Sequence, residues 1–226
     1  MSKDFAASAA QSAKTLTAAI NAETGNTGVK AEAKTYAKLL STAAAATYSI
    51  TLNGTSTGNF SIGSTSVGDA VTKINQISGT TGVSAASSSD GSFVTLYHSQ
   101  GEDITIINDS AGTDLDVVAV GFDGTTAGST VISLAATAGN DSTSVQGNIQ
   151  LTSSKTFSIT QAGTPSLGYF TTGSSSLTAL SNVDIKTAAG ASTAIGTIDG
   201  ALDKISSMRS ELGALDNRLN RSIESL

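Results

Sequence analysis

Cysteine and tryptophan are absent from this 226-residue chain, which has one histidine (His98) and one proline. The chain therefore has no disulfide framework, no thiolate nucleophile and too few histidines for a two-histidine zinc site. No second histidine or nucleophile motif accompanies His98, so we expect it to be a surface residue at a strand end rather than a catalytic one. Four aspartates lack the alternating spacing and closing glutamate of a calcium loop, and we expect solvated loop carboxylates at Asp103, Asp109, Asp114 and Asp116. These absences predict a protein that is not an enzyme and has neither a cofactor nor a metal ion.

Charge and aromatic side chains are also scarce. Charged residues make up 13% of the chain, aromatic residues 4%, and the net charge is −6. Between residues 39 and 183 there are nine acidic side chains and only two basic ones, Lys73 and Lys155. Such a surface cannot neutralise phosphates or stack bases, which excludes nucleic acid as a partner and disfavours anionic lipid. No run of about 18 apolar residues occurs, so we expect no membrane insertion.

Small residues take up most of the chain instead. There are 35 serines, 32 threonines, 32 alanines and 23 glycines, together 122 of 226 positions. Hydrophobic residues make up 38%, but many of them are alanine, so the core must be thin and built from short side chains. This composition suits elongated β layers better than a deep pocket.

An internal repeat is the most informative pattern. The segment INAETGNTGVKA at residues 20–31 recurs as INQISGTTGVSA at residues 74–85, with seven of twelve positions identical. In each copy a helix-compatible stretch ends at a glycine that can adopt a left-handed conformation, and Thr-Gly-Val begins an extended segment. In the second copy Ser66 is the expected N-cap and Asp69 favours the first turn of the helix. The apolar stripe of this helix is Ala70, Val71, Ile74 and Ile77.

Turn signals predict antiparallel strands around the second copy. Asn53-Gly54 predicts a hairpin between residues 48–52 and 59–62, and Asp90-Gly91 predicts another between 82–87 and 92–98. The repeat unit is therefore expected to be one helix on two or three antiparallel strands. Further strands are expected at about 102–107, 116–121, 130–135, 147–151 and 155–160.

The last 36 residues, 191–226, predict one long amphipathic helix. Its apolar residues recur on average about every 3.4 positions, close to the ~3.5 of a coiled coil. We call these residues the seam: Ile195, Ile198, Leu202, Ile205, Met208, Leu212, Leu215, Leu219 and Ile223, followed by Leu226. A lone helix cannot bury such a seam, and the sequence offers no second helix of comparable length. The chain is therefore expected to be an oligomer or a piece of something larger.

The helix sequence resembles a known family. Residues 194–219, AIGTIDGALDKISSMRSELGALDNRL, closely resemble the C-terminal conserved helix of bacterial flagellins, as does VDIKTAAG at 183–190. The most specific part is RSELGALDNR at 209–218. The repeat is similar to the flagellin IN motif of flagellins and some hook-associated proteins. The resemblance implies a secreted structural subunit of the extracellular flagellar filament.

For the fold, the resemblance implies an α+β chain of elongated, mostly antiparallel β variable domains with short helices, ending in one long coiled-coil-type helix. Residues 1–110 would be a variable domain with two repeats, at about 9–52 and 63–107, and residues 111–182 a second β-rich variable segment. Residues 183–226 would be a linker and the C-terminal helix of the core-adjacent D1 domain. The N-terminal helices and the terminal apolar helix of flagellins are missing from this sequence, so we expect the middle of a longer protein.

For partners, the resemblance implies that the seam packs against other flagellin subunits, and that filament cap and hook-junction proteins also bind. It further implies a face of the helix that meets neighbouring subunits or the receptor Toll-like receptor 5. This face consists of Arg209, Glu211, Asn217, Arg218 and Arg221. The response of the receptor to this chain should be weak. Two alternatives remain open. One is a hook-associated or filament-cap protein; the other is a carbohydrate-binding adhesin module, which the scarcity of aromatic residues disfavours.

Overall fold

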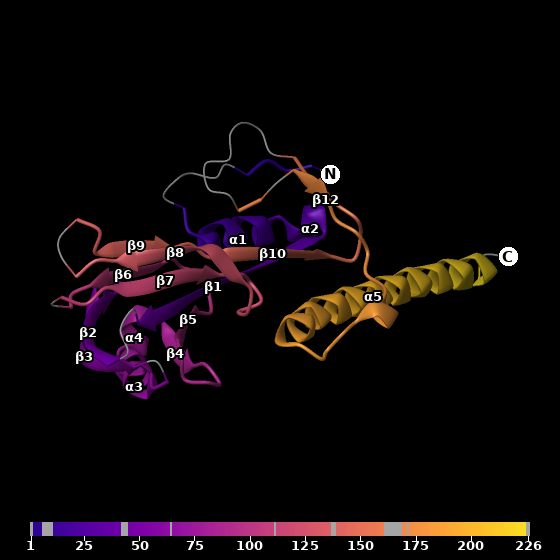
Figure 1. Ribbon diagram of the computed structural model, residues 1–226. Coiled ribbons are helices and arrows are strands. Elements are labelled where there is room, and N and C mark those ends of the chain that lie inside the picture. The colour runs from indigo at the N-terminus through magenta and orange to yellow at the C-terminus, as the bar shows by residue number, and fades with distance from the viewer. Residues whose placement is uncertain are drawn as a thin grey trace.

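The computed structural model describes residues 2–5, 11–41, 45–63, 65–110, 112–136, 139–160, 169–170 and 172–224. Two mostly antiparallel β-sheets with short helices form a body, and one long helix, α5 (Ala188–Glu224), extends from it (Figure 1). The α+β class with a long C-terminal helix is thereby confirmed. The start of the first repeat, residues 9–10, and the last seam residue, Leu226, lie outside the described residues.

The larger sheet is built around β1 (Val29–Ser41), a strand of 13 residues. Side chains of β1 alternate between the two faces, and Ala33, Thr35, Ala37 and Leu39 are buried, as the two-residue period of a strand requires. The strand order is β4-β5-β1-β7-β8, and β10 pairs with the first half of β1. The other strands are β4 (Ser84–Ser87), β5 (Val94–His98), β7 (Leu115–Val120), β8 (Ala127–Leu134) and β10 (Asn148–Ser153).

The smaller sheet has the order β3-β2-β6-β9. Its first hairpin turns at Asn53 and Gly54, whose φ angles of 45° and 81° are the positive values that an Asn-Gly turn adopts, as the sequence predicted. The strands are β2 (Ala45–Leu52), β3 (Thr55–Gly63), β6 (Ile104–Asn108) and β9 (Ser142–Val145). A separate short pair, β11 (Ser158–Ile159) with β12 (Gly173–Ser174), and the 3-10 helix η1 (Leu180–Asn182) lead to α5.

One hydrophobic core joins the two sheets. Helix α3 (Gly68–Gln76) contributes Ala70 and Ile74 to it, both fully buried, while Val71 and Ile77 are partly buried. The expected stripe of this helix therefore faces the core. The largest fully buried side chains are Tyr48, Phe60, Leu39, Ile50, Leu52, Ile62, Ile74, Leu96, Ile104, Ile106, Leu115 and Leu134.

The sequence repeat is also a structural repeat. In the first copy α1 (Ala13–Ala22) and α2 (Thr24–Thr27) precede β1, and in the second α3 and α4 (Ser78–Thr81) precede β4. Asn21 uses both ends of its amide: Nδ2 donates to the carbonyl of Ala31 and Oδ1 accepts from its N–H, each at 2.8 Å. Asn75 binds Ala85 in the same way, at 2.9 and 2.8 Å. The Ile-Asn and Thr-Gly-Val motifs that the two copies share thus form the same helix-to-strand connection in both.

Some local expectations are wrong. Ser66 does not cap α3, which begins at Gly68 after Val67 without a side-chain cap. Asp69 does lie in the first turn of α3, as expected, and its carboxylate accepts a hydrogen bond from the N–H of Ser61 on β3 at 2.8 Å. Strand β9 was not expected, and only Ser158–Ile159 of the expected strand 155–160 is extended in a ladder. Pairing with β6, far away in the sequence, creates β9, so its own four residues carry little signal.

The expected domain division at residues 110 and 111 does not coincide with a break in the sheets. Strands β7, β8 and β10 join the sheet of β1, and β9 joins the sheet of β2. Residues 115–153 therefore share the sheets and the core of residues 29–108. The division into variable segments stays a prediction.

Candidate functional site

The long helix α5 starts at a local cap. The N–H of Gly190 donates to the Thr187 hydroxyl oxygen at 2.9 Å, and the N–H of Ala191 donates to the Thr187 carbonyl at 2.8 Å. Gly190 also passes close to the carbonyl of Asp184, where an added Cβ would lie 2.3 Å away. Thr187 therefore acts as the N-cap, and the chain turns tightly into the helix.

Helix α5 rests on the body through small and charged residues near its beginning. A Cβ added at Gly196 would lie 3.1 Å from the Thr152 methyl group, so the helix backbone approaches β10 closely there. One turn further on, Gly200 faces the carbonyl of Ser153. The ammonium of Lys30 on β1 then pairs with the carboxylate of Asp203 at 2.5 Å. This contact was not predicted, although two glycines four residues apart on a helix allow another backbone to approach closely.

A cleft of about 240 Å³ remains between α5 and the strands below it. Its lining mixes charged side chains of β1 (Lys30, Glu32 and Lys34) with Ile195 and Asp199 of the helix. Among the described residues the contact between α5 and the body is therefore small and mostly polar, with Ala194 as its buried apolar side chain.

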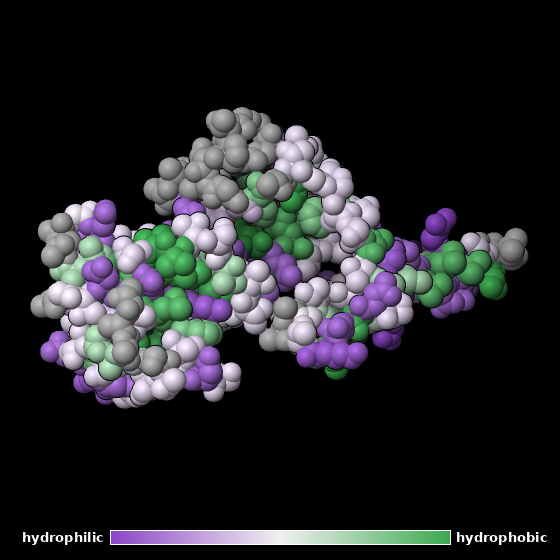
Figure 2. All heavy atoms as spheres, in the orientation of Figure 1, coloured by the Kyte–Doolittle hydropathy of each residue, from purple (hydrophilic) through white to green (hydrophobic). Residues whose placement is uncertain are grey.

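The seam residues are exposed. The exposed fractions run from 42% at Ile198 to 69% at Ile223, and every residue from Leu202 to Glu224 is exposed. At 3.6 residues per turn, Gly196 and Gly200 lie on the side of the helix away from the seam. Figure 2 shows hydrophobic surface recurring along the projecting helix. The body thus contacts α5 through small residues near its beginning, including the buried Ala194, and leaves the seam exposed.

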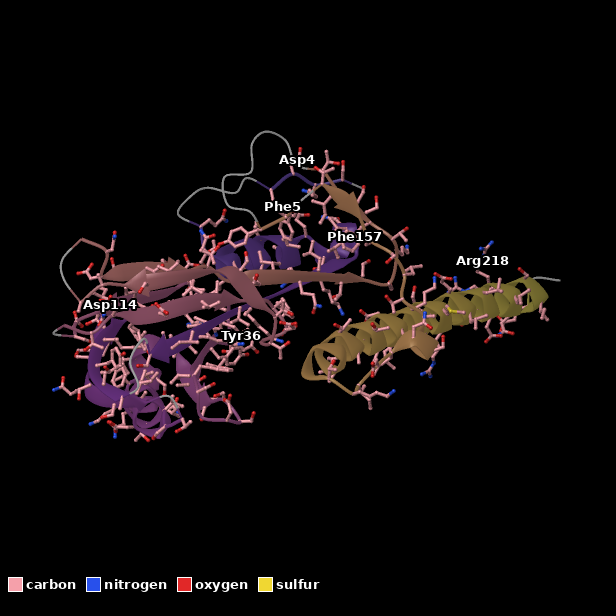
Figure 3. The ribbon with its side chains drawn as sticks, in the orientation of Figure 1. Asp4, Phe5, Tyr36, Asp114, Phe157 and Arg218 are labelled. Carbon is pink, nitrogen blue, oxygen red and sulfur yellow. The ribbon has the colours of Figure 1, made fainter. Side chains whose placement is uncertain are left out.

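The five residues expected to face neighbouring subunits lie in the distal half of α5, and all are exposed: Arg209, Glu211, Asn217, Arg218 and Arg221. Arg218 extends from the helix far from the sheets (Figure 3). The hydroxyl of Ser207 donates to the Glu211 carboxylate at 3.5 Å, one turn away on the same helix. No ion pair joins these five residues to the body within the described part of the chain.

His98 is not a surface residue, contrary to expectation. It is 8% exposed and lies under Gly82, where an added Cβ would be 2.5 Å from Nε2. Burial lowers the pKa of His98, and Lys14 adds to this effect while Glu102 opposes it. Nδ1 accepts a hydrogen bond from the N–H of Gln100 at 3.3 Å. These contacts give His98 a packing role between the second repeat and the turn after β5.

The aspartates of the sequence analysis are dispersed. Asp109 accepts a hydrogen bond from the Thr51 hydroxyl at 2.6 Å, and Asp114 accepts one from the N–H of Ala136 at 3.0 Å. Asp103 is partly buried, and burial raises its pKa. In the ranges that the structure describes, no group of three or more His, Asp or Glu side chains could hold a metal ion. The carboxylates of Asp109 and Asp114 therefore hold turns and strand ends.

A chain with one long helix whose apolar seam is open along its length is typical of proteins that assemble by helix packing. Comparison with curated proteins finds 38% identity over 85 residues to the B-type flagellin of Pseudomonas aeruginosa. The match covers 37% of this chain and 17% of that flagellin, so the chain spans less than a fifth of the relative. No protein-family model matches the chain. Part of this chain is thus similar to a flagellin.

Among the described helices, none is both long and apolar enough to cross a bilayer.

Proposed function

We propose that this chain is part of a structural subunit of an extracellular bacterial flagellar filament. In this proposal α5 packs through its seam against helices of the same protein and of neighbouring copies, while the β-sheets form the outer part of the subunit. The observation that supports it best is the exposure of all nine described seam residues. The partial similarity to a flagellin supports the flagellar filament as the assembly.

The physical basis is the area that the seam leaves in water. Burying a Leu, Ile or Met side chain stabilises an interface by about 1.5–3 kcal/mol. Seam residues such as Leu212 and Leu215 are at least half exposed, so a partner helix would gain much of this energy at each position. Contacts repeated between copies without closure generate filaments, and the proposed work of the chain is therefore mechanical rather than catalytic.

The finer partners belong to the same proposal. Filament cap and hook-junction proteins would bind the assembled subunits, and the exposed Arg209, Glu211, Asn217, Arg218 and Arg221 would meet neighbouring copies. Toll-like receptor 5 would contact the same helix and respond weakly to this chain alone.

A paired substitution in the gene of the source bacterium tests the proposal. Leu212→Glu with Leu219→Glu places two charges in the seam, where each would have to be desolvated on packing. We expect filaments to be lost in electron micrographs while the protein is still made. The purified 226-residue chain should keep its unfolding midpoint, because both leucines are exposed at 64% and 54%.

The matched control is Gln76→Glu with Thr105→Glu, which adds the same charge on the body, away from α5 and from the five exposed residues of its distal half. Both control positions are exposed. Filaments should persist in the control. Filaments of normal length in the seam variant would refute the proposed role of α5, and a bacterium whose filaments do not contain this protein would refute the function as a whole.

A further inference from the structure

Strand β8 is an unusually open edge of the larger sheet. It lies at the end of the order β4-β5-β1-β7-β8 and has eight residues, of which the first seven are exposed. Val131 is 58% exposed and Ile132 is 40% exposed. Its sequence, AGSTVISL, has no charged residue and no proline, two of the devices that keep a strand edge from pairing. The register with β7 shifts between Val118 and Val120, and the ladder is regular from Val131 to Leu134, where the apolar side chains lie.

The other edges of the two sheets are short or covered. Strands β4 and β9 have only four residues each. On β3 the carboxylate of Asp69 accepts a hydrogen bond from the N–H of Ser61, and Gly63 exchanges backbone hydrogen bonds with Ser66. Strand β10 is flanked by α1 and α5. Protection at these edges makes the open edge at β8 a specific feature of this fold.

Apolar side chains continue from the core onto β8, where they are exposed to solvent. Leu39, Val117 and Ile132 form a row across β1, β7 and β8, since each is the registered partner of the next. Leu39 and Val117 are fully buried, whereas Ile132 is 40% exposed. On the other face, Val118 is 6% exposed and its partner Val131 is 58% exposed. A further strand beside β8 would cover both exposed side chains.

We propose that β8 pairs antiparallel with β8 of a second copy of this chain, forming a sheet continuous across two molecules. Antiparallel pairing about a two-fold axis brings a strand opposite itself, so any charge on it would meet its own like charge. The absence of charge between Ala127 and Leu134 removes that repulsion and favours a copy of this chain over a charged partner strand. This contact is separate from the seam on α5.

Sedimentation velocity at chain concentrations from micromolar to millimolar tests the proposal. The measurements use the variant Leu212→Glu with Leu219→Glu, in which the charged seam cannot associate. We expect the weight-average mass to rise toward twice that of the monomer. Ser129→Lys with Val131→Lys should move the midpoint of association to at least tenfold higher concentration, because lysines then face lysines. The control, Gln76→Lys with Thr105→Lys, adds the same charge at exposed positions away from β8 and should leave the midpoint unchanged.

Amide hydrogen exchange identifies the contact. Residues 127–134 should become more protected as the chain concentration rises, and circular dichroism should show all variants folded. A mass that stays monomeric throughout, equal association of the two lysine variants, or concentration-dependent protection confined to another segment would overturn the proposal. None of these outcomes bears on the filament test of the seam.

Discussion

The ammonium of Lys30 lies 2.5 Å from the Asp203 carboxylate and joins β1 to α5 across 173 positions of the sequence. Both side chains are about half exposed, at 54% and 51%, so solvent screens the pair and its contribution is about 0–1 kcal/mol. The neighbouring contacts come from Gly196 and Gly200, which have no side chains to bury. The orientation of α5 on the body therefore depends on a few weak contacts.

Lys30→Ala should loosen α5 without unfolding the body. The chain lacks cysteine, so spin labels can be placed at Ser61→Cys on β3 and Ser210→Cys on α5. We expect the distance distribution between the labels to broaden in Lys30→Ala, and in the unsubstituted chain at high salt. Lys73→Ala, a change on α3, is the control and should keep the narrow distribution. An unchanged distribution in Lys30→Ala would show that the ion pair does not orient the helix.

The two glycines of the repeat offer a matched test of packing. Gly28 and Gly82 have φ angles of +70° and +72°, so alanine at either position costs about 1–2 kcal/mol in backbone strain. Only at Gly82 would the new Cβ also meet a side chain, with His98 Nε2 at 2.5 Å; at Gly28 the nearest atom is 4.0 Å away. Gly82→Ala should therefore lose about 1–3 kcal/mol more than Gly28→Ala in urea unfolding. Equal losses would mean that His98 moves aside freely.

His98 should make stability depend on pH. Burial lowers its pKa from the ordinary value of 6.5, so the folded chain binds fewer protons there than the unfolded chain. The stability that His98 contributes is thus complete above about pH 6.5 and is lost as the pH falls through the lowered pKa.

In His98→Gln this loss should disappear. We therefore expect the free energy of unfolding to fall less between about pH 7.5 and about pH 5 in the variant than in the unsubstituted chain. Apart from Glu102, whose lowered pKa depends in part on His98, the carboxylates have the same surroundings in both chains, so the difference between the two slopes reports His98 and its interaction with Glu102. Parallel slopes would contradict the burial of its ring in solution.

Local signals predicted the turns of this fold correctly. Asn53-Gly54 and Asp90-Gly91 both lie between paired strands, as predicted. These turns use positive φ angles at Asn53, Gly54 and Gly91, and whether a residue adopts such an angle depends mainly on that residue itself. Predictions that depended on distant partners were less successful. His98 is buried because Gly82 of the repeat covers it. The cap at Ser66 is the local signal that was wrong, since Ser66 pairs with Gly63 and the helix begins after Val67.

The sequence by itself determined the repeat, the turns and the apolar period of the last helix, because each depends on residues a few positions apart. Only the tertiary structure decided that β1 is the centre of the larger sheet and that β8 is left open, because strand order depends on pairing across long separations. It also decided which side of α5 meets the body. Gly196, Gly200 and Asp203 approach β10 and β1, and the seam stays exposed because α5 projects beyond the sheets after that point.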